Sequence, residues 1–213
     1  MNYDESTLIH ELTDPLRRPA AEQALRARGA AAVPALLAAL EEDLGPEARR
    51  SILRLLLQLG NGRAEDAFRQ AVYSADEESR AIGARGLFQL NAPDSLQANL
   101  SAIDDAPDPL HNDITPAVTA LSKMGMAALP DLLPLLDAPH ARTRQRAQRV
   151  LERVTLDEMT RRSGQPPDSE RARREWRELW EHNGSYRFDA SQEDRQHAIH
   201  LWKIWLDAQI LIQ

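Results

Sequence analysis

The chain has 213 residues, an apolar share of 42%, few aromatic residues and a formal net charge of −7 at pH 7. It contains no cysteine, which excludes disulfides and thiolate metal sites. The acidic balance argues against a general affinity for nucleic acid or anionic membranes, and no apolar run is long enough to span a bilayer. Because the amino terminus also lacks the features of a signal peptide, we expect a soluble cytoplasmic protein without a nucleic-acid or membrane partner.

One segment occurs twice in the chain. Residues 29–40 have the sequence GAAAVPALLAAL, and residues 125–136 have the sequence GMAALPDLLPLL. The two copies begin 96 residues apart, which is three times 32, and two weaker copies fit between them. A period of this length is typical of stacked repeats, in which each unit buries its apolar face only against its neighbours.

The first half of each repeat is predicted to be a helix, because its leucines lie three and four residues apart, as at Leu36, Leu37 and Leu40. Prolines near the start of such a helix cost little, because the first N–H groups have no intrahelical partner. Glycines just past a helix end favour a positive φ. The residues in these two roles are Pro34 and Pro130, and Gly29, Gly60 and Gly125.

The second half of each repeat begins with an arginine, followed three, six, seven and ten residues later by small or apolar residues. These offsets place the side chains on one helical face, and small residues midway allow the paired helix to approach closely. The leading residues are Arg18, Arg49, Arg80 and Arg144, and we expect them to hold turn carbonyls or acidic groups of neighbouring units. The fourth copy begins at Ile114, lacks the arginine and follows a longer turn, so we expect a local irregularity there.

The Gly-x-x-Ala-Val/Leu-Pro-x-Leu-Leu opening, together with a turn and an Arg-led helix, resembles the HEAT repeat family, particularly its short bacterial units. The resemblance covers roughly residues 5–155, about five helix pairs. It implies an all-α fold, a right-handed α-α superhelix or solenoid. We expect residues 1–155 to form this solenoid and residues 156–213 to form a tryptophan-rich helical cap.

Within the expected cap, residues 156–167 are predicted to be a connector. A helix capped by Asp168 or Ser169 is predicted to run to about Trp180 or Glu181, and a second helix to run from near Ser191 to the carboxyl end. These helices hold all four tryptophans, which form either a binding surface or the cap of the repeat stack. The cap is favoured, because each tryptophan left in water would forfeit roughly 4–6 kcal/mol of burial.

No catalytic constellation or cofactor site is visible, so we expect neither an enzyme nor a bound cofactor. His197 and His200 with Glu193 are spaced for a metal site, but the same spacing arises on any solvated helix face. His10-Glu11 resembles one iron-binding pair of the HEAT-type deoxyhypusine hydroxylases, a family that needs several such pairs. The HEAT-like bilin lyases share the repeat, so a lyase or chromophore-handling protein stays open as the alternative.

The expected function is a non-catalytic scaffold or adaptor that binds a partner helix or peptide along its concave face. Residues four and eight positions after the leading arginine face away from its stripe and are apolar in the middle repeats, with arginines beside them that could pair with acidic groups. The alternative is that these residues fill gaps between helices. The sequence does not indicate the partner or the oligomeric state. The candidate partner-binding residues are Leu53, Arg54, Leu57, Ala84, Arg85, Phe88 and Val118, with Arg149 beside them.

Overall fold

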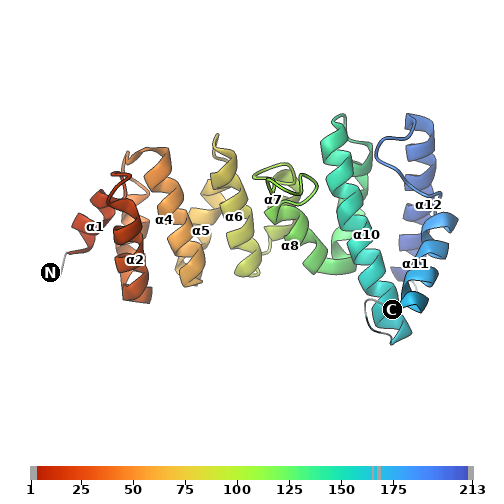
Figure 1. The fold of residues 1–213 in the computed structure, drawn as a ribbon, viewed down its shortest axis with the longest axis horizontal. Coiled ribbons are helices and arrows are strands. Elements are labelled where there is room, and N and C mark those ends of the chain that lie inside the picture. Colours follow the sequence, from red (N-terminus) through yellow and green to blue (C-terminus); the bar gives the residue numbers. More distant parts are fainter. Residues whose placement is uncertain (1–3, 165, 167–168, 211–213) are drawn as a thin grey trace. The chain divides into compact units, whose positions relative to one another are not determined.

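The computed structural model describes residues 4–164, 166 and 169–210, and all the regular structure in this part of the chain is helical (Figure 1). The expected all-α class is confirmed. Within the same residues, no helix combines the length and hydropathy needed to cross a membrane. The chain divides into two compact units, Met1–Ala106 and Pro107–Gln213, each of which is described by itself.

The first unit consists of helix pairs. The Arg-led helices α2, α4 and α6 follow one another side by side, since α2 packs on α4 and α4 packs on α6 (Figure 1). The shorter helix α3 packs on α4, and α5 packs on α6. The elements are α1 (Glu5–Glu11), α2 (Arg18–Arg28), the 3₁₀ turn η1 (Gly29–Ala32), α3 (Val33–Ala39), α4 (Gly45–Leu59), η2 (Gly62–Ala64), α5 (Glu65–Ala71), α6 (Glu77–Gln89) and α7 (Ser95–Ser101).

The pair α5–α6 owes its close approach to two glycines. A Cβ added at Gly83 would lie 2.6 Å from the Phe68 carbonyl oxygen, and one at Gly86 would lie 2.4 Å from the Phe68 ring. Both distances are below van der Waals contact, so any side chain here would force the helices apart. The predicted role of small residues midway along the second helix is confirmed for this pair.

The second unit begins with α8 and ends with the carboxyl-terminal helices. Its long helix α10 packs on α8, on the repeated segment and on α11, while α12 packs on α9 and η4. The elements are α8 (Pro116–Met124), η3 (Gly125–Ala128), α9 (Leu129–Leu132), η4 (Leu133–Asp137), α10 (Ala141–Ser163), α11 (Glu170–His182) and α12 (Gln192–Ile210).

The two copies of the repeated segment share one backbone conformation at their start. Gly29 has φ 60° and ψ −136°, and Gly125 has φ 68° and ψ −147°. Glycine adopts this region without the strain that a Cβ would cause. A 3₁₀ turn follows in each copy, and Pro34 or Pro130 then lies in the first turn of the next helix. The predicted roles of these glycines and prolines are confirmed.

The predicted connector at 156–167 is wrong for most of its length, because α10 continues without a break to Ser163. Apolar Leu156 and Met159 extend the helical spacing, and Glu158 binds Arg161 and Arg162 one turn later, with N–O distances of 2.7 and 2.6 Å. The helix ends at Gly164, which has φ 62°. The predicted boundary between a solenoid of residues 1–155 and a cap of residues 156–213 therefore falls inside α10, and the division itself stays a prediction.

The helices expected to carry the tryptophans are present. Ser169 caps α11 by accepting a hydrogen bond from the Ala172 N–H, whereas Asp168 lies outside the described residues. The rings form a continuous chain from α11 to α12, in which Trp176–Trp180, Trp180–Trp202 and Trp202–Trp205 have centroids 5.3, 5.3 and 5.4 Å apart. Trp202 is fully buried. Trp176, Trp180 and Trp205 are only partly buried, so whether the cluster also binds a partner stays untested.

The predicted irregularity lies in the turn between α7 and α8, where the boundary between the two units also falls. The helix after this turn, α8, has no leading arginine. Within the second unit, arginines of α10 bind residues of the turn instead. Arg146 Nε donates to the Asn112 carbonyl at 3.0 Å, and Arg149 Nε donates to the Asp113 carboxylate at 2.6 Å. The next helix pair thus supplies the missing contact.

Candidate interaction surface

Each leading arginine binds one or two main-chain carbonyls at the end of the preceding helix or in the turn that follows it. Arg18 Nε lies 2.8 Å from the Leu12 oxygen, and Arg49 Nη1 lies 2.9 Å from the Leu40 oxygen. Arg80 reaches two such carbonyls at 3.1 and 3.0 Å, and Arg144 reaches two at 2.8 Å each. The prediction that these arginines hold the turns is confirmed. These contacts give the arginines a structural role.

Two of these arginines also reach the following repeat. Arg18 Nη1 lies 3.3 Å from the Glu47 carboxylate, and Arg80 Nη2 lies 2.6 Å from the Asp105 carboxylate. Asp105 is buried, unlike the solvated acidic residues that usually occupy turns. Its hydrogen bond raises the pKa of the Arg80 guanidinium. A buried carboxylate with a hydrogen-bonded partner ties α6 to the end of α7.

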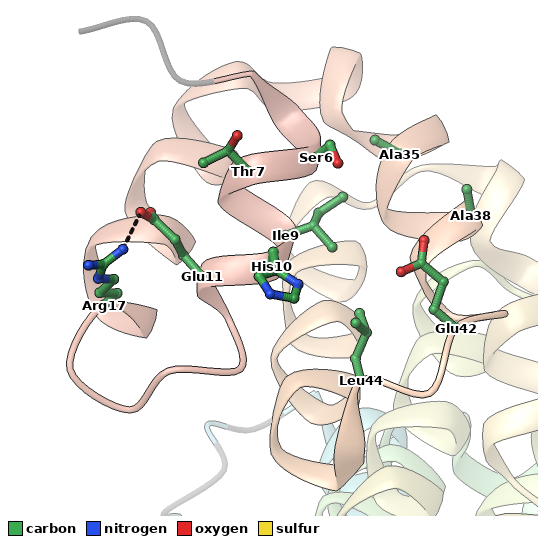
Figure 2. Close-up of a pocket in the computed structure, with 10 residues that line it drawn as sticks. All are labelled: Ser6, Thr7, Ile9, His10, Glu11, Arg17, Ala35, Ala38, Glu42 and Leu44. Atoms are coloured by element: carbon green, nitrogen blue, oxygen red, sulfur yellow. Dashed lines mark hydrogen bonds and ion pairs between the residues drawn. The ribbon is translucent and has the colours of Figure 1, made fainter.

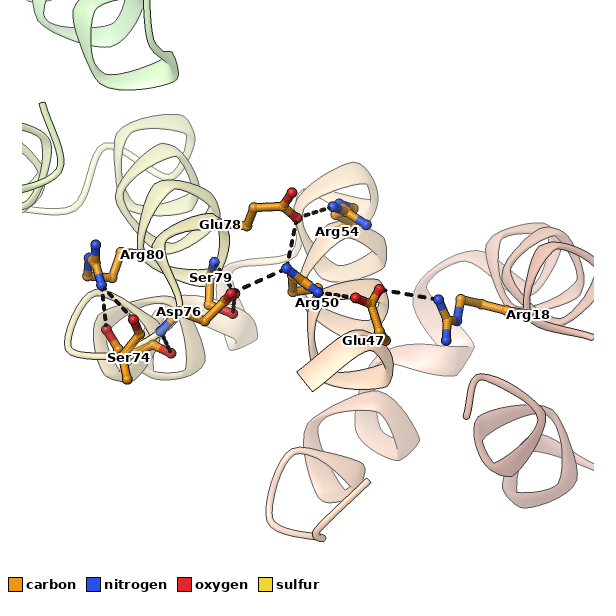
Figure 3. Close-up of polar contacts among 10 residues, drawn as sticks. Arg18, Glu47, Arg50, Arg54, Ser74, Asp76, Glu78, Ser79 and Arg80 are labelled. Carbon is orange, nitrogen blue, oxygen red and sulfur yellow. Dashed lines mark hydrogen bonds and ion pairs between the residues drawn. The ribbon is translucent and has the colours of Figure 1, made fainter. Parts of the chain in front are cut away.

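A line of ion pairs crosses the first unit from α2 to α6 (Figure 3). Glu47 lies between Arg18 and Arg50, and Arg50 in turn lies 3.3 Å from Asp76. Partial burial would raise the pKa of the Asp76 carboxyl, but hydrogen bonds from Ser79, together with Arg50, lower it. Most of these groups are at least partly exposed, so each pair contributes little free energy while the line aligns the helices.

The apolar strip expected to bind a partner is not open. Leu53 and Val118 are 0% exposed and Ala84 is 1% exposed, Leu57 is 9% exposed, and Phe88 is only partly accessible. Val118 also belongs to the second unit. The expectation of an exposed strip is wrong, because neighbouring Arg-led helices pack sideways and cover this second stripe. The alternative, that these residues fill gaps between helices, describes the structure.

The arginines beside the strip are exposed, and they form part of a polar outer row made of Arg26, Arg54, Gln58, Arg85 and Gln89 on α2, α4 and α6. Three bonds connect its members to an adjacent helix. Arg26 Nε donates to Gln58 Oε1 at 2.7 Å, Gln89 Nε2 donates to the Leu57 carbonyl at 3.1 Å, and Arg54 Nη2 lies 2.5 Å from Glu78 (Figure 3). The Arg85 side chain makes no hydrogen bond or ion pair within the described residues.

Corresponding positions of the second unit are also cationic. Lys123 on α8 and Arg153 on α10 are exposed, and α8 packs on α10. Arg149, predicted to lie beside the strip, is exposed and bound to Asp113 and Glu152. Exposed cations therefore lie on the second helices of both units, five residues after the leading position in α4, α6 and α10 and nine residues after it in α8 and α10, although the chain as a whole is acidic.

A pocket of about 510 Å³ lies between α1 and α3 (Figure 2). Ile9, Ala35 and Leu44 supply apolar wall, and His10 faces the same space. The Glu11–Arg17 ion pair, 3.5 Å long, borders one side. The pocket is open and mixed in polarity, and sequence reasoning did not find it because it depends on how the short α1 covers α3.

The described residues contain no group of three or more His, Cys, Asp or Glu side chains placed to hold a metal ion. His197, His200 and Glu193 accordingly do not form such a group, although they lie on one helix. His10 and Glu11 border the pocket described above without a further ligand.

Comparison with known proteins gives no relative: no family model, no curated protein and no solved structure matches the chain.

Proposed function

We propose that this protein is a non-catalytic scaffold built of HEAT-like helix pairs, and that it binds a protein partner along the outer row. The superhelical stacking of the pairs, as in a right-handed solenoid, is part of the same proposal. The row replaces the buried apolar strip as the binding surface. Arg54 and Arg85 are the two residues that the strip hypothesis and the present proposal share.

The observation that supports the proposal is the regular placement of exposed groups on successive helices. Arg54 and Arg85 each lie five residues after a leading arginine, and Gln58 and Gln89 lie nine residues after it. Because α4 packs on α6, these groups repeat across the first unit at the interval between neighbouring helices. A linear array of hydrogen-bonding side chains suits an elongated partner such as a peptide segment.

A steric block of the outer row tests this proposal. The full-length chain is used to capture proteins, which are identified, purified and titrated against the chain by calorimetry. Gln58→Trp places a bulky ring in the row and is expected to weaken the complex, whereas Gln70→Trp, at an exposed site on α5, is expected to leave it unchanged. Equal weakening by both variants would contradict the assigned surface, and bound pigment in the purified chain would favour the chromophore-handling alternative.

A further inference from the structure

We infer that the partner segment is acidic, with carboxylates that bind the guanidinium groups of Arg85 and Arg54 on adjacent helices. This inference rests on the proposed function and specifies the chemistry of the partner at the same outer row.

The first argument is the unused hydrogen-bonding capacity of the row. Arg85 is exposed on α6 and has no partner within the described residues. Arg54 uses one terminal nitrogen for Glu78, and Arg26 uses Nε for Gln58, so both retain further N–H donors. A carboxylate accepts two parallel N–H bonds from one guanidinium, which is the strongest single contact available to such a group.

The second argument is charge. The chain has a net charge of −7, yet the positions five and nine residues after the leading arginines of α2, α4 and α6 carry no carboxylate: they are Gln23, Ala27, Arg54, Gln58, Arg85 and Gln89. Glu78, the carboxylate that contacts Arg54, is also bound to Arg50. An acidic segment would meet complementary charge on the row and repulsion elsewhere, which sets its register.

The third argument is spacing. Packed helices lie about 8–10 Å apart, and a peptide in the polyproline II conformation has three residues per turn and advances roughly 3.1 Å per residue. Carboxylates three residues apart in such a segment lie on one face, about 9 Å apart, and therefore match equivalent positions on α4 and α6. Phe88, which is partly accessible on α6, offers limited apolar contact to the intervening residues.

A phosphate backbone is the less suitable anion. Nucleic acid binding depends on a surface that neutralises many closely spaced phosphates, and its affinity falls with the repulsion of an acidic protein. The outer row holds a few cations separated by glutamines. Such an arrangement suits separate carboxylates better than a continuous polyanion.

The test uses the full-length chain and a fluorescein-labelled peptide of about ten residues with glutamate at every third position, long enough to cross adjacent helices. Fluorescence anisotropy measures its binding, and the same peptide with glutamine in place of glutamate is the matched probe. We expect the glutamate peptide to bind saturably. We expect the affinity of the glutamine peptide to be lower by roughly tenfold or more.

Two charge-reversal variants locate the site. Arg85→Glu is expected to weaken binding of the glutamate peptide by roughly tenfold or more, because it removes the free guanidinium and adds a repelling charge. Arg63→Glu makes the same change in net charge at an exposed site on η2, outside the outer row, and is expected to change binding by less than about twofold. Circular dichroism melting of both variants shows whether they remain folded.

Equal weakening by the two variants would overturn the inference, because it would indicate a general effect of net charge. Tighter binding of a single-stranded oligothymidylate of equal length would overturn it in favour of nucleic acid. A protein partner that loses affinity with Gln58→Trp but not with Arg85→Glu would contradict the acidic segment while leaving the proposed function intact.

Discussion

Segment 29–40 packs against α1 and α4, whereas segment 125–136 packs against α10 and α12. Both begin with the same glycine conformation and 3₁₀ turn. Their ends are held differently. The Leu40 carbonyl accepts a hydrogen bond from Arg49, while the equivalent Leu136 carbonyl accepts one from the Tyr186 hydroxyl at 2.6 Å.

The carboxyl-terminal residues add further bonds to the second copy. Arg195 and Gln196 bind the Asp137 carboxylate at 2.9 and 3.0 Å, and Arg144 Nε donates to the Phe188 carbonyl at 2.9 Å. The first copy has the short α1 on one side, with the pocket of Figure 2 between them. The comparison shows that the repeated residues specify the conformation at the start of the segment. The neighbouring residues determine how many hydrogen bonds hold its end.

The largest expected effect comes from removing the anchor that the first copy lacks. Tyr186 is 1% exposed, so Tyr186→Ala is expected to lower the free energy of unfolding of the second unit by about 3–5 kcal/mol, through lost packing and the lost bond to Leu136. Urea denaturation measures the change. Tyr73→Ala is the control, because Tyr73 is 85% exposed and its removal is expected to have little effect. Similar losses in both variants would mean that Tyr186 is no special anchor.

A proline exchange tests why the two helices differ in type. Pro134 lies at the position equivalent to Ala38 and has no N–H to donate to an α-helical hydrogen bond. The segment around it, η4, is therefore a 3₁₀ helix rather than an α-helix. Ala38→Pro is expected to destabilise the first unit by about 3 kcal/mol, and Pro134→Ala to change stability by less than about 1 kcal/mol. Thermal melting followed by circular dichroism measures both. A neutral Ala38→Pro would mean that α3 is not constrained to α-helical bonding.

The leading arginines of the two copies, Arg49 and Arg144, are expected to differ less in their contribution to the free energy of unfolding. Arg144→Met removes three bonds to carbonyls and is expected to cost about 2 kcal/mol, whereas Arg49→Met removes one and is expected to cost about 1 kcal/mol. Methionine keeps much of the apolar stem, so packing changes little. Urea denaturation of both variants makes the comparison, and a larger loss for Arg49→Met would reverse it.

Alkaline pH gives the smallest effect. Burial raises the pKa of Tyr186 to about 12 from its usual 10.0. The neutral phenol is thus favoured in the folded state, so its stabilising contribution is complete below pH 10 and is lost as pH rises toward 12. We expect a loss on the order of 1 kcal/mol near pH 11. Urea midpoints across this range measure it, and Tyr186→Phe should show a shallower decline.

The sequence predicted the local features of the fold because each depends on a residue with one dominant physical property. Gly29 and Gly125 tolerate positive φ, and the leading arginines carry donors long enough to span a turn. The close approach expected at small residues midway along the second helix occurs at Gly83 and Gly86. The predicted connector began too early, because the apolar residues after Thr155 continue the helical spacing and α10 ends only at Gly164.

The candidate site was harder to predict. Helical periodicity separates the two faces of one helix, but it does not show which neighbours lie beside that helix. Leu53 and Ala84 face away from the stripe of their leading arginine, yet they are buried because α4 and α6 pack against each other. Arg54 and Arg85, one residue further along, remain exposed. A shift of one position, about 100° around a helix, therefore separates a buried side chain that fills the gap between helices from an exposed one.

The leading arginines bind carbonyl oxygens, which every amino acid carries. Substitutions in the bends that they close, such as residues 41–44, 74–75 and 138–140, therefore leave the fastening in place. Mutation can rewrite the outward chemistry of these bends without loosening the helix pairs, so a descendant of this molecule could change its recognition properties there while keeping its architecture.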